Sequence, residues 1–400
     1  MKNRNLSIDC FKGEKMISDK VLILFPYEIN INNGGPSGFL AHNLLDKPRD
    51  CFVLSQDVIK THPEKITKKI DYIIKRILFL WKNRGKDKGK LKEEFFYKYY
   101  FEKSEAKNYK YIFFHETIHF ERFRKYISEN QVIILQSHSP EIPSVEYRNW
   151  APLNTEEISF REKAEKEAFK RADIVVFPNE GCVSIYETLV TDRSKIKYIL
   201  SGAKKDYNND GQKSYKLPED KINLMYIGRR NKIKGFDIVL ETFRKAREKR
   251  KDINLVIIGN GEKINEEGIT DIGFSKNPIG WYNSADYLIN ANRQSYFDLS
   301  VIEALTTGIP IIMSDNFGHS YYKGKSSLIK TFDVDNPNGL YEILTGNLEK
   351  RDYRRRENME LYEKNLRTLG VTDIRDREGF GSTDMGDVSH CCPTIHPHFP

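Results

Sequence analysis

Residues 224–235 read Leu-Met-Tyr-Ile-Gly-Arg-Arg-Asn-Lys-Ile-Lys-Gly, an apolar run that stops at a glycine and continues into a cluster of cations. From Phe236 onward, apolar residues recur at helical spacing, so the pattern predicts a buried strand, a cationic loop and a helix. Such a loop points unpaired backbone N–H groups and the positive end of the helix dipole at one spot. With Arg229 and Lys234 beside that spot, we predict a site for a doubly anionic group such as a diphosphate.

A second segment, residues 296–310, carries one acid in an otherwise apolar helical register. It reads Tyr-Phe-Asp-Leu-Ser-Val-Ile-Glu-Ala-Leu-Thr-Thr-Gly-Ile-Pro, and the acid within the helical pattern is Glu303. A carboxylate suits the hydroxyls of a sugar because it accepts two hydrogen bonds at once. Diphosphate plus ribose is a nucleotide, so the two segments together predict a nucleotide site.

The two segments resemble the signature of the retaining GT-B glycosyltransferases of the group 1 (family 4) type. Residues 228–235 are similar to the Gly-Arg…Lys-Gly motif of that family, and residues 297–310 are similar to its Glu-x7-Glu segment. Ser295 stands where the first Glu of that segment belongs, and Gln294 next to it is a candidate substitute. The two motifs occur in the family's order, which makes the pair more specific than either motif alone.

The resemblance implies an α/β fold of the GT-B type, with two Rossmann-like, doubly wound domains that face each other across a cleft. It also implies transfer of a sugar from a nucleotide-sugar donor to an acceptor, with retention at the anomeric carbon. The residues then expected in catalysis are His138, Arg229 and Lys234. Those expected to bind the donor and its nucleotide are Gly34, Gly35, Gly228, Gly261, Ser295, Phe297, Asp298, Leu299 and Glu303.

The length of 400 residues is sufficient for two domains of ordinary size. We expect a Rossmann-like, acceptor-side domain over residues 1–200, with a basic amphipathic insert at 57–110. A nucleotide-sugar-binding domain is expected over 201–369. Residues 370–400 lack hydrophobic periodicity, which predicts a disordered tail.

Short continuous apolar runs alternate with helical patterns in both halves, which predicts two parallel sheets with helical crossovers. The runs in the first half are 21–25, 51–54, 111–114, 132–135 and 173–177, and those in the second are 224–227, 254–258, 286–290 and 309–312. Residues 340–366 predict one long charged helix near the end of the second domain.

Polar residues follow several of these runs, at the edge where open parallel sheets bind ligands. Gly34 and Gly35 belong to a glycine-rich loop after the first run, where a ligand could approach backbone N–H groups; a plain flexible turn is the alternative. His138 follows the run at 132–135, and in the family a histidine here lies by the donor sugar. A hydrogen-bonded structural role is the alternative for His138, as it is for His115 and His119.

The net charge of +8 is concentrated in one region. Residues 60–98 contain 13 Lys and Arg against 5 Asp and Glu, a surplus equal to that of the whole chain. Between residues 66 and 81, apolar residues recur at helical spacing and form a stripe, and the lysines lie outside it. This pattern is typical of a helix that lies on anionic lipid. The stripe consists of Ile66, Ile70, Ile73, Ile74, Ile77, Leu78, Leu80 and Trp81. The alternative is that the stripe packs on its own domain. The remainder of the chain is neutral, which argues against a general nucleic-acid binder.

The remaining features concern compartment and cofactors. Five cysteines without framework spacing indicate reduced thiols, and neither a signal peptide nor an apolar run of membrane-spanning length is apparent. We therefore predict a cytoplasmic protein, peripheral at the inner face of the plasma membrane. Because Arg229 and Lys234 would stabilise the leaving diphosphate, neither a metal nor a cofactor is expected.

The expected partners are a nucleotide-sugar donor, a glycan or lipid-linked saccharide acceptor of bacterial surface polysaccharide biosynthesis, and an anionic membrane, without nucleic acid. Two other functions remain open on the sequence. One is a non-hydrolysing sugar-nucleotide epimerase on the same fold, which would release free products without any acceptor. The other is a nucleic-acid-binding protein that uses the basic insert, for which salt-dependent binding would be diagnostic.

Overall fold

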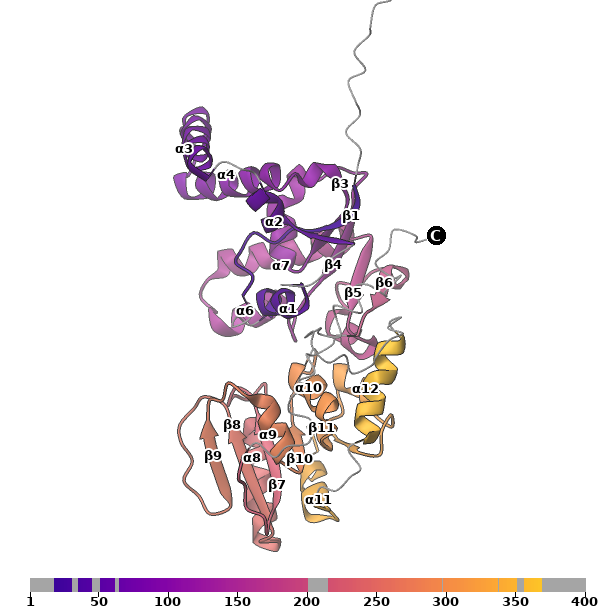
Figure 1. Cartoon of the computed structure of the whole chain (residues 1–400). Coiled ribbons are helices and arrows are strands. Elements are labelled where there is room, and N and C mark those ends of the chain that lie inside the picture. The colour runs from indigo at the N-terminus through magenta and orange to yellow at the C-terminus, as the bar shows by residue number, and fades with distance from the viewer. Residues whose placement is uncertain are drawn as a thin grey trace, which may run out of the picture.

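The computed structural model describes residues 18–30, 35–44, 51–61, 65–200, 215–296, 298–336, 338–350 and 356–368. In this part of the chain two six-stranded parallel sheets follow one another in the sequence, each flanked by helices (Figure 1). The predicted α/β architecture is therefore confirmed. The predicted tail at 370–400 and Gly34 lie outside the described residues.

The first sheet has the strand order β2-β1-β3-β4-β5-β6. Continuous apolar runs form its centre because both faces of a parallel sheet are covered by helices. The strands are β1 (Ser18–Ile23), β2 (Phe52–Leu54), β3 (Tyr109–Phe114), β4 (Val132–Gln136), β5 (Ile174–Phe177) and β6 (Ile196–Tyr198). The surrounding helices are α1 (Gly35–Leu44), α2 (Ser55–Thr61), α3 (Lys65–Lys82), α4 (Lys88–Lys103), α5 (Thr117–Phe123), α6 (Pro143–Trp150) and α7 (Thr155–Arg171).

The second sheet has the order β12-β11-β10-β7-β8-β9. Its strands are β7 (Ile222–Ile227), β8 (Ile253–Ile258), β9 (Ile269–Gly273), β10 (Tyr287–Asn290), β11 (Ile311–Ser314) and β12 (Ile329–Phe332). Its helices are α8 (Phe236–Lys249), α9 (Pro278–Ser284), α10 (Leu299–Thr307), α11 (Gly339–Thr345) and α12 (Arg356–Thr368). The strand order reverses between β7 and β10, and open α/β sheets bind ligands at such a reversal.

The prediction of one helix over 340–366 is wrong. α11 ends at Thr345 because Gly346 adopts an extended backbone, and the Gly346 carbonyl accepts a hydrogen bond from Arg250 Nη1 at 2.8 Å. The chain begins a second helix, α12, at Arg356. α12 packs against α10 of the second domain, as Figure 1 shows.

Two short 3-10 segments contact each other where the domains meet. They are η3 (Glu180–Tyr186) of the first domain and η6 (Phe317–Tyr322) of the second. The Asn179 side chain donates to the Gly318 carbonyl at 3.1 Å, and the Cys182 thiol donates to the Tyr296 carbonyl at 3.3 Å. The Tyr296 ring is buried in the hydrophobic core of the first domain, 6.0 Å from the ring of Tyr186. The loop that precedes α10 is therefore anchored in the other domain.

Among the described helices, none combines the length and the apolar character required to cross a bilayer.

Candidate active site

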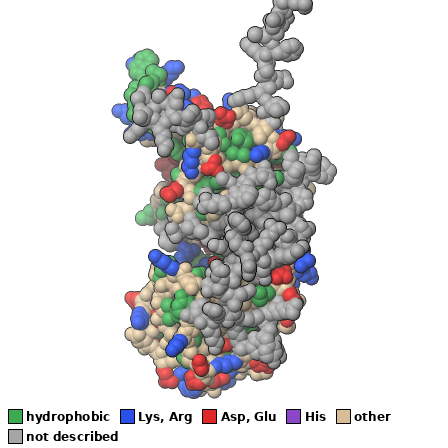
Figure 2. All heavy atoms as spheres, viewed as in Figure 1, with side chains coloured by type: hydrophobic (Ala, Val, Ile, Leu, Met, Phe, Trp, Pro, Cys, Tyr) green, Lys and Arg blue, Asp and Glu red, His purple; other side chains and the backbone are tan. Residues whose placement is uncertain are grey.

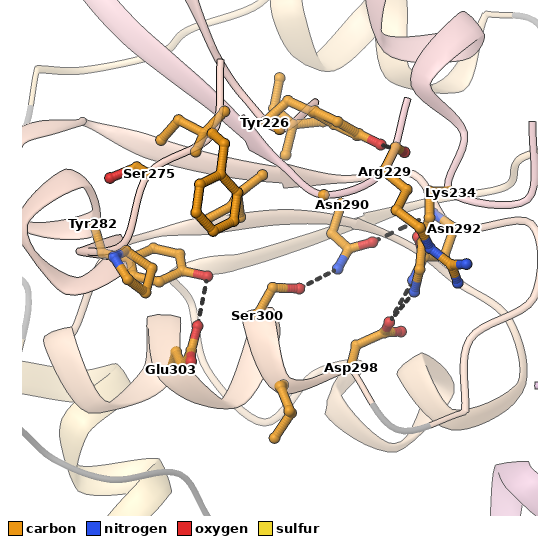
Figure 3. A pocket seen from close by; sticks show the side chains of 18 of the residues that line it. Tyr226, Arg229, Lys234, Ser275, Tyr282, Asn290, Asn292, Asp298, Ser300 and Glu303 are labelled. Carbon is orange, nitrogen blue, oxygen red and sulfur yellow. Dashed lines mark hydrogen bonds and ion pairs between the residues drawn. The ribbon is translucent and has the colours of Figure 1, made fainter. Parts of the chain in front are cut away.

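A cavity of about 520 Å³ opens at the strand reversal of the second sheet. It is bounded by the carboxyl ends of β7 and β10 and by the first turns of α10, so the fold brings together two segments that are remote in sequence. Its lining includes six of the predicted site residues, namely Gly228, Arg229, Lys234, Asp298, Leu299 and Glu303. We call this cavity the donor pocket (Figure 3).

The two consecutive arginines after β7 have different surroundings. Arg230 is buried and held by the Asp271 carboxylate at 2.8 and 2.5 Å, and it also donates to the Gly259 carbonyl. Arg229 lines the pocket, and no carboxylate in the described part of the chain forms an ion pair with it. Arg229 is therefore the guanidinium that remains available to an anionic ligand.

Lys234 is positioned by the glycine that follows it. Gly235 has a φ of +65°, and a Cβ there would lie 1.9 Å from the Ala291 carbonyl oxygen, so only glycine fits where α8 begins. The Lys234 ammonium then lies 2.8 Å from Asp298 Oδ1, and Asn292 Nδ2 donates to the same oxygen at 2.5 Å. Figure 3 shows these three side chains converging at one end of the donor pocket.

Asp298 is the centre of a buried polar cluster. His319 Nε2 lies 2.7 Å from Asp298 Oδ2, and His319 Nδ1 lies 2.9 Å from Ser314 Oγ. Burial alone would raise the pKa of Asp298, but the charges of Lys234 and His319 hold it well below its usual range. Asp298 is therefore an anion that fixes Lys234, and it would repel a phosphate that approached it directly.

Glu303 lies on α10 at the other end of the pocket, where Tyr282 donates a hydrogen bond to Glu303 Oε2 at 3.1 Å (Figure 3). Burial raises the pKa of Glu303 to about 7, partly offset by the hydrogen bond from Tyr282. The pocket is thus cationic at the Arg229 end and carries a hydrogen-bond acceptor at the Glu303 end. This polarity matches a diphosphate at one end and hydroxyls at the other.

Two of the residues expected to bind the donor, Ser295 and Gly261, lie outside the donor pocket. Ser295 is buried outside the pocket lining, where it accepts from the His319 backbone N–H at 2.9 Å and donates to the Asn316 carbonyl at 2.6 Å. Gly261 packs against Arg230, since a Cβ there would lie 2.5 Å from Arg230 Cδ. Both contacts are with the protein itself. Phe297 lies outside the described residues.

His138 lies in a separate cavity of about 620 Å³, formed at the carboxyl ends of β3 and β4 in the first domain. We call it the acceptor-side pocket. Its lining also includes Gly35, His115, Glu116 and, from the second domain, Arg229. Burial raises the pKa of Glu116 to about 7, which the charge of Arg161 opposes.

Sequence reasoning missed His319, Asn292 and Tyr282, the side chains that orient Asp298 and Glu303. They belong to no sequence motif, because each contacts Asp298 or Glu303 only once the chain is folded. The one Asp-x-Asp of the chain, Asp333 to Asp335, follows β12 and lines neither the donor pocket nor the acceptor-side pocket.

Residues 221–345 match the family model described as glycosyl transferases group 1. This match covers 125 of the 400 residues. The match begins one residue before β7 and ends with α11, so it includes the whole donor pocket. The matched residues include both motifs, 228–235 and 297–310, and the match supports the resemblance to group 1 glycosyltransferases.

Two curated proteins are similar in sequence to part of this chain. The O-antigen biosynthesis glycosyltransferase WclY of Escherichia coli is 28% identical over 145 residues, which are 34% of this chain and 39% of WclY. An uncharacterized 41.2 kDa protein in the cps region of Klebsiella pneumoniae is 27% identical over 135 residues, which are 31% of this chain and 37% of that protein. The alignments therefore span less than half of either relative.

A solved structure is similar over a larger part of the chain. The sucrose-phosphate synthase of Thermosynechococcus elongatus superimposes with a TM-score of 0.52 at 18% sequence identity, covering 68% of this chain and 72% of that chain. At this identity the similarity concerns the fold, and it supports the two-domain GT-B arrangement that the sequence predicts.

Proposed function

We propose that this protein is a glycosyltransferase that moves a sugar from a nucleotide-sugar donor to the hydroxyl of an acceptor. The observation that carries the proposal is the position of Arg229, which lines both the donor pocket and the acceptor-side pocket. A cation at this boundary would stabilise charge on a diphosphate as the bond to the sugar breaks. The group 1 domain over residues 221–345 supports the same activity.

The donor would bind with its ribose at the Glu303 end of the pocket and its diphosphate at the cationic end. The Glu303 carboxylate would accept hydrogen bonds from the ribose hydroxyls, while Lys234 and Arg229 would contact the diphosphate. Because Arg229 also borders the acceptor-side pocket, the sugar beyond the diphosphate would lie near His138. We therefore assign binding of the nucleotide to Glu303, charge stabilisation to Lys234 and Arg229, and contact with the sugar to His138.

Retention at the anomeric carbon is part of the proposal, because the motifs at residues 228–235 and 297–310 resemble those of retaining enzymes. We further propose that the acceptor is a glycan or a lipid-linked saccharide of bacterial surface polysaccharide biosynthesis. The names of the two relatives, one an O-antigen biosynthesis glycosyltransferase and the other a protein in a cps region, support this choice.

Helix α3 supports an anionic membrane as a further partner. Its Tyr72 and Phe79 rings pack against Phe95 of α4, but Ile77 and Trp81 are 60% and 64% exposed. Figure 2 shows hydrophobic and cationic side chains together on this projecting part of the first domain. A mixed apolar and basic face of this kind favours anionic lipid. We propose that the enzyme works at the cytoplasmic face of the plasma membrane, where a lipid-linked acceptor would be presented.

The experiment that tests the function begins with a thermal-shift screen against UDP, GDP, dTDP and CMP and their sugars. The nucleotide that stabilises the protein identifies the donor class. Incubation with that donor and candidate acceptors should then give a glycosylated product whose anomeric configuration, read by NMR, equals that of the donor. Release of free products without an acceptor would instead support an epimerase. Stabilisation by DNA or RNA alone would support a nucleic-acid binder.

A further inference from the structure

His115 and His138 form a hydrogen-bonded pair that the proposed function does not yet explain. His115 follows β3 and His138 follows β4, and His115 Nδ1 lies 2.8 Å from His138 Nε2. The planes of the two rings are nearly parallel, at an interplanar angle of 22°. The Phe39 ring lies 4.5 Å from the His138 ring and the Phe113 ring 4.2 Å from the His115 ring, measured between centroids. Each imidazole is therefore packed against an aromatic ring.

Only one proton can lie between the two facing nitrogens. Burial lowers the pKa of His138 to about 3 and that of His115 well below its usual value, so both rings are neutral near pH 7. A neutral imidazole carries one N–H and one lone pair. Therefore either His115 Nδ1–H donates to His138, or His138 Nε2–H donates to His115.

The remaining nitrogen of His115 decides between these two arrangements. His115 is 2% exposed, and its Nε2 is buried without a hydrogen-bond partner in the described part of the chain. If His138 were the donor, this nitrogen would be an orphaned buried N–H, which is rare in folded proteins and costly. If His115 is the donor, Nε2 carries only a lone pair. The arrangement in which His115 Nδ1–H donates to His138 Nε2 is therefore favoured.

We propose that His115 is a positioning residue that holds His138 in the tautomer protonated at Nδ1. His138 Nδ1 forms no hydrogen bond within the described chain and is not among its buried unpartnered atoms, so it is open to the acceptor-side pocket. In that tautomer His138 presents an N–H donor beside Arg229. It then binds an oxygen atom of a sugar or a phosphate and does not act as a base toward an acceptor hydroxyl.

The tautomer can be measured without any substrate. The full-length protein, labelled with 15N in histidine, is studied by long-range 1H–15N correlation at pH 7, and the His138 signals are assigned by their loss in His138→Gln. We expect a pyrrole-type shift for Nδ1 and a pyridine-type shift for Nε2 of His138. The opposite pair of shifts in the parent protein overturns the proposal, whatever the enzyme's reaction.

Two variants separate positioning from simple packing. His115→Asn keeps an N–H donor near the place of Nδ1, so His138 should retain its Nδ1–H tautomer. His115→Leu removes the donor, so His138 should convert to the Nε2–H tautomer that free imidazoles prefer. An unchanged His138 tautomer in a folded His115→Leu protein would show that His115 only fills space. If His115→Leu does not fold, the parent spectrum alone decides.

The consequence for turnover rests on the proposed function. Loss of one neutral hydrogen bond to a sugar oxygen should lower kcat/KM about tenfold in His115→Leu, and His115→Asn should recover most of it. If the tautomer changes as expected while kcat/KM stays constant, the inference about His115 stands, and His138 is not in contact with the reacting sugar.

Discussion

The ammonium of Lys234 lies 2.8 Å from the carboxylate of Asp298, although one residue follows β7 and the other precedes α10. The pair spans the strand reversal of the second sheet, and the contact with Asp298 holds the lysine side chain at the donor pocket. A flexible lysine would otherwise lose rotamer freedom on binding, at about 1–2 kcal/mol. The arrangement therefore preorganises the cation that we assign to the diphosphate.

Replacement of this cation should affect turnover strongly. We expect Lys234→Ala to reduce kcat on the order of 10²–10³-fold, because it removes a charge directed at the leaving diphosphate. The matched control is Lys232→Ala, since Lys232 is an exposed cation of the same loop outside the pocket lining. Equal kinetics for the two variants would show that Lys234 does not contact the leaving group.

Glu303 should make nucleotide affinity depend on pH. Its pKa is raised to about 7, and only the carboxylate form offers all its lone pairs to ribose hydroxyls, so affinity should fall as the pH decreases through 7. Calorimetry at several pH values for the parent and for Glu303→Gln separates this effect from titration of the phosphate itself, which both proteins share. We expect a flatter profile in Glu303→Gln.

Glu303→Ala should also weaken binding of the free nucleoside diphosphate, on the order of 10–100-fold, because hydrogen bonds to a charged group are lost. Unlike Lys234, Glu303 would make its contacts both before and during the reaction. A Glu303→Ala protein that binds the nucleotide as tightly as the parent would exclude the ribose assignment.

The buried histidines of the first domain should reduce stability in acid. The pKa of His119 is lowered to about 3 by burial, whereas an unfolded histidine has a pKa near 6.5. The unfolded chain therefore binds a proton that the folded chain does not, and stability falls below pH 6.5 by up to about 1.4 kcal/mol per pH unit for each such histidine.

Glu116 and Glu303, whose pKa values are raised, act in the opposite direction, so the test is a comparison of two proteins. His119→Phe keeps a ring against Phe25 and Tyr27 and removes one titrating group. Urea unfolding at pH 7.5 and 5.5 should show a smaller loss of stability on acidification in the variant. An equal loss in both proteins would contradict the prediction.

Transfer activity should persist after chelation of divalent metals. Arg229 and Lys234 already supply two positive charges at the diphosphate end of the pocket, so we expect rates with and without EDTA to agree within about twofold. The measurement is the initial rate in dialysed protein. A large loss that Mg²⁺ restores would show that the two cations are not sufficient.

The exposed apolar edge of α3 should bind anionic vesicles. Replacing Ile73, Ile77 and Trp81 by Ser should release the protein from phosphatidylserine vesicles in flotation assays, and high salt should weaken the binding of the parent. Leu153→Ser is the control, because Leu153 is an exposed apolar residue elsewhere on the same domain. Vesicle binding that survives the triple replacement would assign the membrane contact to another surface.

The sequence predicted the strands at the strand reversal because β7 and β10 are buried on both faces and read as continuous apolar runs. It missed β9 and β12, the edge strands of the second sheet, which carry polar residues such as Asp271 and Lys330. Edge strands are partly exposed, so their composition resembles that of a loop.

At the site, the motifs located Arg229 and Lys234 because they flank a predictable strand and helix, and Glu303 because it lies within a predictable helix. They could not locate the pairs that orient these groups. His115 and His138 meet because β3 and β4 are neighbours, and His319 reaches Asp298 because η6 is anchored against η3. Contacts of this kind depend on strand order and domain packing, for which a single sequence has no local signal.

The burial of Tyr296 in the first domain also bears on how such proteins can be recombined. The loop that carries it continues directly into Asp298 and α10, so the donor half of the molecule depends on a cavity built by Tyr186 and Cys182 of the other half. A chimaera that joined residues 215–368 to an unrelated acceptor half would expose the Tyr296 ring to water. The loop before α10 would then lose the contacts that hold it in place. Exchange of modules between relatives is therefore restricted to acceptor halves that preserve this cavity.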